Sequence, residues 1–186
     1  MSYFLCVIVG INANCVDSFD VQKEGDSRIG NSRQIIVQQP YFFCDGRINS
    51  FIVSLKLDDD TDVEYPYIQV WRNLSSVAYT LVGQYQLQKS DITKRLNYYL
   101  ANVTLTGANR IEFQSEDVVG YYQPSRPRFL VWSDENVRGY TTYNVDSQSP
   151  LNMVMINTRF ISRRVNQDER PLIQALYGKH DGCNYT

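Results

Sequence analysis

The sequence predicts an all-β protein: an antiparallel β-sandwich, jelly-roll-like, with about nine or ten short strands. Short segments that alternate apolar and polar residues are separated by turn signals roughly every 8–12 residues, as is usual in sandwiches and jelly rolls. The chain contains fourteen tyrosines and eight phenylalanines, residue types that favour pleated, half-buried surfaces. No segment has the periodicity of a helix longer than about two turns.

The length and composition predict one globular domain with less regular ends. A chain of 186 residues can bury one good core, and 43% hydrophobic with 20% charged residues is ordinary for a folded protein. We expect four parts, which are a signal peptide at residues 1–13, a loop-rich lead-in at 14–33, the β-sandwich domain at 34–162, and a linker or C-terminal tail at 163–186.

The N-terminus predicts secretion. Residues 3–11 form an apolar run, and the small-residue exit that follows favours cleavage of a signal peptide after Ala13. The segment is short and has no lysine or arginine before it, so a buried first strand is the alternative. No later stretch approaches the roughly 18 apolar residues that a membrane span requires. We therefore expect an extracellular or cell-surface protein with no membrane insertion of this chain.

Cysteines and sequons support the same compartment. Cys6 would leave with the signal peptide, and we prefer a Cys15–Cys44 disulfide among the pairings that four cysteines allow. Cys183 is then left over, either as a free thiol or paired with sequence of a longer multidomain protein. Three Asn-x-Ser/Thr sequons are candidate glycosylation sites, and they begin at Asn73, Asn102 and Asn184.

The strands are predicted from alternation and from the turns between them. Residues 48–57 alternate most cleanly, with Phe51, Val53 and Leu55 on one face. Gly83 interrupts the strand expected at residues 78–87, so a bulge or a close backbone approach is expected there. The other strands are expected at residues 34–38, 67–72, 96–105, 111–113, 118–122, 129–132, 140–143 and 151–162.

Residues 110–122 are predicted to form a corner of the sandwich. Ile111 and Phe113 alternate with polar neighbours, residues 115–117 break the pattern, and residues 118–122 resume it. The acidic residues of this stretch are therefore expected to serve the turn, with Gly120 in the strand that follows.

The sequence argues against catalysis and against a cofactor. His180 is the single histidine and lies in the polar tail, so a Ser-His-Asp, Cys-His or Cys/His zinc site has no support. Neither a nucleophile elbow nor a phosphate-binding loop occurs. A net charge of -2 gives no basic field, so nucleic acid is not an expected partner.

Two groups of acidic residues are candidate sites. Glycoside hydrolysis needs paired carboxylates, for which Glu112, Glu116 and Asp117 are the nearest candidates, although a solvated strand edge and turn is the better interpretation. The second group is an acidic run whose alternating carboxylates could offer oxygen ligands to calcium; these weak candidates are Asp58, Asp60, Asp62 and Glu64. The run lacks the glycine and the distant glutamate of an EF-hand, so a solvated loop is favoured over a metal site.

Aromatic and basic residues around the loop at 124–128 are the predicted binding surface. Tyrosine and tryptophan faces bind sugars and cationic partners, and about half of these rings are expected in the core. The candidate binding residues are Tyr121, Tyr122, Arg126, Arg128 and Trp132, with Tyr140 nearby.

The strand and turn residues between Cys44 and Trp132 resemble a known type of module. The resemblance is found in the segments Cys44-Asp-Gly-Arg-Ile48, Tyr67-Ile-Gln-Val-Trp-Arg72, Tyr79-Thr-Leu-Val-Gly83 and residues 111–122. They are similar to an uncharacterised extracellular β-sandwich module of large cell-surface proteins of simple animals, often beside EGF-like repeats. Where that pattern often has glycine before the aspartate of the corner, this chain has Glu116. The resemblance implies an adhesion or receptor ectodomain role and supplies no catalytic residues.

Three hypotheses follow. The first is a binding or adhesion module that recognises an extracellular protein or glycan without catalysis. The second is a jelly-roll lectin or carbohydrate-active enzyme that uses paired carboxylates, with or without calcium, and it requires a concave groove with two facing carboxylates and exposed aromatics. The third is a structural spacer, which would have no concave site.

Overall fold

The computed structural model describes residues 5–9, 12–16, 20–28, 34–42, 45–58, 64–75, 78–124, 128–137, 141–145, 159–167 and 170–179. In these residues the regular structure is strand, apart from two single 3-10 turns, η1 (Lys89–Asp91) and η2 (Gly107–Asn109). The prediction of an all-β fold is confirmed.

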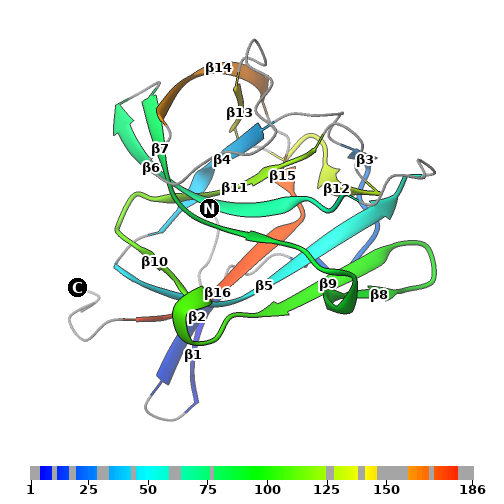
Figure 1. Ribbon diagram of the computed structural model, residues 1–186, viewed down its shortest axis with the longest axis horizontal. Helices are drawn as coiled ribbons and strands as arrows, with labels where there is room; N and C mark the ends of the chain where they lie inside the picture. Colours follow the sequence, from blue (N-terminus) through cyan, green and yellow to red (C-terminus); the bar gives the residue numbers. More distant parts are fainter. Residues whose placement is uncertain are drawn as a thin grey trace.

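The first sheet is built around β5 (Gly46–Leu57), the longest strand of the described chain (Figure 1). One edge of β5 pairs with β10 (Ile111–Phe113) and β9 (Tyr99–Thr104), and the other pairs with β16 (Ile173–Lys179) and β12 (Phe129–Asp134). Shorter strands extend this sheet, with β8 (Ile92–Lys94) on β9, β3 (Ser27–Arg28) and β15 (Arg170–Pro171) on β12, and β2 (Asn12–Val16) joining β16 to β1 (Leu5–Val9).

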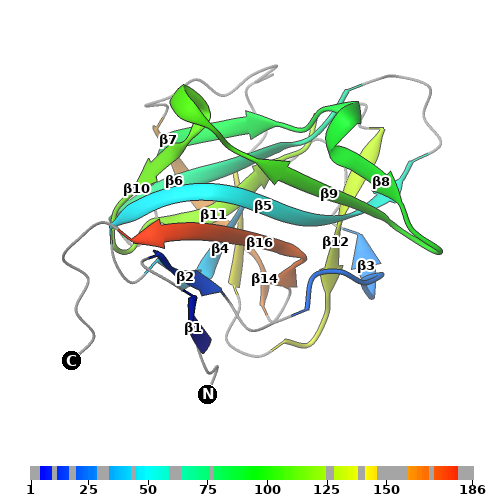
Figure 2. The same cartoon turned by 90° about the horizontal axis from the view of Figure 1, so that it is seen from below.

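The second sheet has six strands and closes on itself. In order they are β11 (Val118–Tyr122), β4 (Gln34–Tyr41), β13 (Thr141–Val145), β14 (Arg159–Gln167), β7 (Ala78–Gln86) and β6 (Tyr67–Ser75). The last, β6, pairs with the first, β11, over residues 67–71 and 118–122. The pairings of both sheets are antiparallel, and the sheets pack against each other as a β-sandwich (Figure 2).

Closure of the second sheet explains why both faces of β6 are buried. Ile68 and Val70 belong to the main core, together with Phe51 and Val53 of the opposite sheet. Trp71 points the other way and joins a second cluster. Because successive side chains of a strand point to opposite faces, the alternation expected for a one-sided strand is replaced here by an almost continuous buried run. The second cluster consists of Trp71, Tyr79, Leu81, Val118 and Tyr122.

The sequence predicted that the sandwich ends at Ser162, but the structure continues it beyond this residue. Residues 163–186 were predicted to be a linker or tail, but Ile173–Lys179 forms β16, which pairs with β5 over much of its length. Leu172 is fully buried. The charged residues before Pro171 obscured a short apolar strand, and long-range pairing with β5 supplies the partner that local sequence does not reveal.

The lead-in is also part of the folded domain. Val21 is 1% exposed and packs with Trp132 and Leu172 in a third hydrophobic cluster. The Tyr98 hydroxyl donates a hydrogen bond to the Gln22 carbonyl oxygen (2.6 Å), and the Ser54 hydroxyl donates to the carbonyl oxygen of Lys23. This segment therefore covers the face of the first sheet that points away from the main core.

The N-terminal and modification predictions are tested only in part. Leu5–Val9 and Asn12–Val16 form a hairpin in which Cys6 is the backbone partner of Cys15. Signal cleavage and secretion stay predictions, and Cys44, Cys183 and Asn184 lie outside the described residues. The other two sequon asparagines, Asn73 and Asn102, are exposed. No helix in the described part of the chain is long and apolar enough to cross a membrane.

The turn predicted at residues 115–117 is present and is tied to the segment after β4. The Glu116 amide donates to the Phe42 carbonyl oxygen (2.8 Å), and the Phe42 amide donates to the Asp117 carbonyl oxygen (2.9 Å). Asp117 is 1% exposed and accepts the Gln114 amide on Oδ2 (2.8 Å). Glu116 and Asp117 are thus part of the turn and its hydrogen bonds.

Glu116 occupies a backbone conformation that favours glycine. Its φ is 71°, in the left-handed region that glycine adopts without a steric penalty. We expect Glu116→Gly to raise the free energy of unfolding by about 0.5–1 kcal/mol, less than the full penalty because glycine also loosens the unfolded chain.

Chemical denaturation of this variant has a matched control. Asn136 also has a positive φ of 60°, but asparagine tolerates this region, so Asn136→Gly should change stability by less than about 0.5 kcal/mol. Destabilisation by Glu116→Gly would show that the Glu116 side chain contributes more than its backbone strain costs.

Candidate functional site

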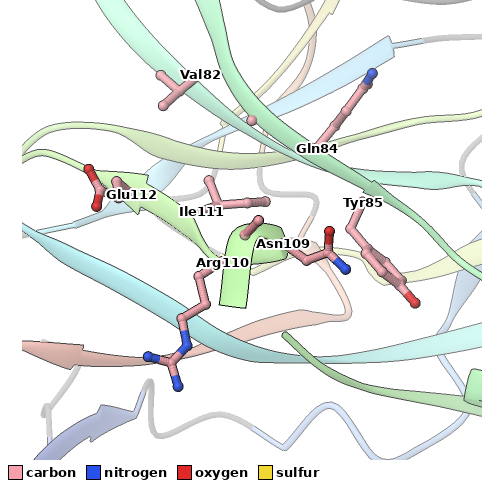
Figure 3. Close-up of a pocket in the computed structure, with 9 residues that line it drawn as sticks. Val82, Gln84, Tyr85, Asn109, Arg110, Ile111 and Glu112 are labelled. Atoms are coloured by element: carbon pink, nitrogen blue, oxygen red, sulfur yellow. The ribbon is translucent and has the colours of Figure 1, made fainter. Parts of the chain in front are cut away.

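The candidate site is a groove of about 300 Å³ between β7 and the segment that leads from η2 into β10 (Figure 3). It therefore lies where one sheet meets the other. Ligand sites are concave, and this volume is at the lower end of those that hold small molecules. The lining residues are Val82, Gly83, Gln84, Tyr85, Ala108, Asn109, Arg110, Ile111 and Glu112.

The groove has an apolar centre where β10 lies directly against β7. Ile111 is 6% exposed, and an added Cβ at Gly83 would lie 2.6 Å from its Cγ2 atom. The β6–β7 register also shifts beside Gly83, between Val70 and Trp71. Both features predicted from the glycine, a bulge and a close approach, are thus confirmed. A side chain at position 83 would displace Ile111 and change the groove.

We expect Gly83→Ala to destabilise the protein by about 1–3 kcal/mol, because the added methyl group overpacks a close contact. In an Ile111→Ala background the clashing atoms are gone, so the same change should cost less than about 1 kcal/mol. Urea denaturation of the two single variants and the double variant measures this coupling. Equal costs in both backgrounds would contradict the contact.

A tyrosine hydroxyl is fixed at one end of the groove. The Tyr85 hydroxyl donates a hydrogen bond to Asp91 Oδ2 (3.1 Å), which also accepts the Gln88 amide (2.7 Å). Burial of the ring, followed by the hydrogen bond and the charge of Asp91, raises the pKa of Tyr85. The phenol is therefore neutral at physiological pH, and its oxygen keeps lone-pair capacity to accept a hydrogen bond from a ligand.

The single carboxylate that lines the groove is held by an arginine from the neighbouring strand. Arg47 of β5 lies opposite Glu112 of β10. The Arg47 guanidinium approaches Glu112 Oε1 through Nε (3.0 Å) and Nη2 (2.9 Å). Glu112 thus has its charge compensated. It remains 69% exposed.

Gln84 belongs to a polar chain in the second sheet. Its Oε1 atom accepts a hydrogen bond from Gln69 Nε2 (2.9 Å), and Gln69 Oε1 accepts one from Trp71 Nε1 (3.2 Å). Figure 3 shows the Gln84 side chain pointing away from Ile111. We therefore assign Gln84 a structural role.

Asn109 and Arg110 are the polar side chains of the groove that the fold leaves available. Both are exposed, and neither side chain has a hydrogen bond or ion pair within the described part of the chain. Their backbones are ordered by η2, because the Asn109 amide donates to the Thr106 carbonyl oxygen (3.1 Å) and the Arg110 amide donates to that of Gly107 (3.3 Å). In Figure 3 the Asn109 amide lies on the same side of Ile111 as the Tyr85 ring.

The binding surface predicted around residues 124–128 is not formed by the aromatic residues assigned to it. Tyr121 is in the main core, Tyr122 in the second cluster and Trp132 in the third. Each is at most 9% exposed. Their strands bury both faces, which the sequence pattern did not show. Arg128 is exposed and Arg126 lies outside the described residues.

The acidic candidates are separated or used elsewhere. Asp117 is paired with Arg72, Glu116 is in the turn, and Glu112 is paired with Arg47. Asp60 and Asp62 lie outside the described residues, whereas Asp58 and Glu64 are described. Among the described residues, no group of three or more His, Cys, Asp or Glu side chains could hold a metal ion.

Comparison with known proteins adds no relative, since no family model, curated protein or solved structure matches this chain. The assignment of the groove as a candidate site therefore depends on its geometry alone. The sequence signal for it is Gly83 inside a strand, which predicts a close approach but does not by itself mark a binding site.

Proposed function

We propose that this chain is a secreted or cell-surface binding module whose groove recognises a saccharide on an extracellular partner, without catalysis. The observation that carries the proposal is the groove itself, whose lining combines the polar residues Asn109, Arg110 and Tyr85 with the apolar residue Ile111. Sugars present vicinal hydroxyl groups and weakly apolar ring faces, so this combination of planar donors, acceptors and apolar surface complements them.

The size and rigidity of the groove support a small ligand. Tyr85, Glu112 and Asn109 are carried by β7, β10 and η2, and Arg110 directly follows η2. Sites on regular elements hold their groups more precisely than sites on long loops. A volume of about 300 Å³ suits one or two sugar rings of a longer chain.

Binding is supported over hydrolysis by the state of the acids near the groove. Glycoside hydrolases of either type use two carboxyl groups that flank the scissile bond, about 5–9.5 Å apart. Here Glu112 is engaged by Arg47, and Asp91 is engaged by Tyr85 and the Gln88 amide. This arrangement favours the module that recognises a partner over the carbohydrate-active enzyme.

A glycan array probed with the purified chain tests the proposal. We expect retention of a defined set of saccharides by the unaltered protein and its loss in Asn109→Ala, which removes a groove amide. Asn97→Ala is the matched control, because Asn97 is also an exposed asparagine but lies in the turn between β8 and β9.

Two results would overturn the proposal. One is the absence of any retained saccharide from a folded protein, as judged by its melting temperature. The other is retention that Asn109→Ala and Asn97→Ala reduce equally, since that would place the contact outside the groove.

A further inference from the structure

We infer that the saccharide is acidic, and that Arg110 recognises its carboxylate or sulfate group. The inference rests on the proposed function and adds the chemical class of the ligand. It comes from the two charged side chains of the groove, of which one has an ion-pair partner among the described residues and the other has none.

The lining of the groove includes two charged side chains, Arg110 and Glu112. Glu112 is neutralised by Arg47, which approaches it within 3.0 Å through two guanidinium nitrogens. Arg110 is not neutralised by any described residue. Within the described part of the chain, Arg110 is therefore a positive charge without a paired acid beside the Arg47–Glu112 ion pair, and the complementary ligand carries a negative charge.

The remaining acid near the groove does not offset Arg110 directly. Asp91 lies at the Tyr85 end, where it is held by the Tyr85 hydroxyl and the Gln88 amide. In Figure 3 the Arg110 side chain points away from β7, on which Tyr85 lies. The groove thus has a neutral end with the phenol and Asn109 amide, and a cationic end at Arg110.

The chemistry of the guanidinium decides which anion fits. Arginine presents parallel N–H groups that pair with both oxygens of a carboxylate or a sulfate, so it fixes the orientation of the anion as well as attracting it. A sugar that carries such a group would place it at Arg110 and its neutral hydroxyl groups near Asn109 and Tyr85. A simple anion would use the guanidinium alone.

Isothermal titration calorimetry with matched probes tests the inference. The probes are α-1,4-linked trigalacturonate and α-1,4-linked galactotriose, which differ in their carboxylates, with glucuronate-terminated and glucose-terminated disaccharides as a second pair. We expect the acidic member to bind about tenfold or more tightly, since hydrogen bonds to charged groups are the stronger ones. Its affinity should also fall as the salt concentration rises.

Arg110→Gln should weaken binding of the acidic member far more than that of the neutral member, so that the preference for the acidic member is lost. Arg95→Gln is the matched control, because Arg95 is an exposed arginine in the turn between β8 and β9, and it should retain the preference. Equal affinities for acidic and neutral members would overturn the inference and leave the proposed function standing. A preference that survives in Arg110→Gln would also overturn it. If no member of either pair binds and the array shows no binding either, the proposed function and the inference fall together.

Discussion

Asp117→Ala is expected to lower the free energy of unfolding by about 3 kcal/mol, because it removes one partner of a largely buried ion pair and a turn acceptor together. Arg72 Nε and Nη2 each lie 3.1 Å from an Asp117 carboxylate oxygen. The Asp117 side chain is 1% exposed and that of Arg72 is 36% exposed. The loss leaves a half-buried guanidinium without its partner and the Gln114 amide without its acceptor.

The exposed pair Arg47–Glu112 provides the control for this prediction. Its side chains are 47% and 69% exposed, and surface pairs contribute at most about 1 kcal/mol. Glu112→Ala should therefore be nearly neutral by urea denaturation. If the two variants lose similar stability, the corner at residues 114–117 does not stabilise the fold as described.

Asp134→Ala is the second change with a large expected effect, about 3 kcal/mol. Asp134 Oδ2 lies 2.8 Å from Arg170 Nη2 and 2.9 Å from Lys23 Nζ. The Asp134 and Arg170 side chains are 5% and 15% exposed, so removing the acid leaves a buried cation uncompensated. Lys23 is 42% exposed and contributes less, but it ties the lead-in to β12.

Thermal unfolding and limited proteolysis check this prediction together. Asp134→Ala should lower the melting temperature and expose residues 20–28 to cleavage before the rest of the domain unfolds. Glu135→Ala, a change to the exposed neighbouring acid, should do neither. A stable, protease-resistant Asp134→Ala protein would mean that Val21 and the β3–β12 pairing suffice to hold the lead-in.

Local sequence predicted the elements well where apolar and polar residues alternate and a turn is marked. Alternation correctly predicted the strand at residues 48–57, and turn chemistry correctly predicted the bulge at Gly83 and the turn at residues 115–117. The strand at residues 173–179 was missed because its identity depends on pairing with β5, more than a hundred residues away. Closure of the second sheet was missed for the same reason, since β6 and β11 meet only in the folded protein.

The site was the less predictable part. Tyr121, Tyr122 and Trp132 are conspicuous in sequence, but strands with two buried faces place them in three different clusters. Asn109 and Arg110 have no distinctive motif, and packing of β10 on β7, which includes the contact between Gly83 and Ile111, brings β7 beside them. Sequence identifies residues that are unusual, whereas a groove between two sheets is created by packing.

The most direct test of the groove is an NMR titration of the isotope-labelled chain with a saccharide retained on the array. The amide signals of residues 82–85 and 108–112 are predicted to shift together and saturably, while those of residues 128–134 stay unchanged. Shifts concentrated at residues 128–134, or spread over the surface without saturation, would contradict the assignment of the groove as the binding site.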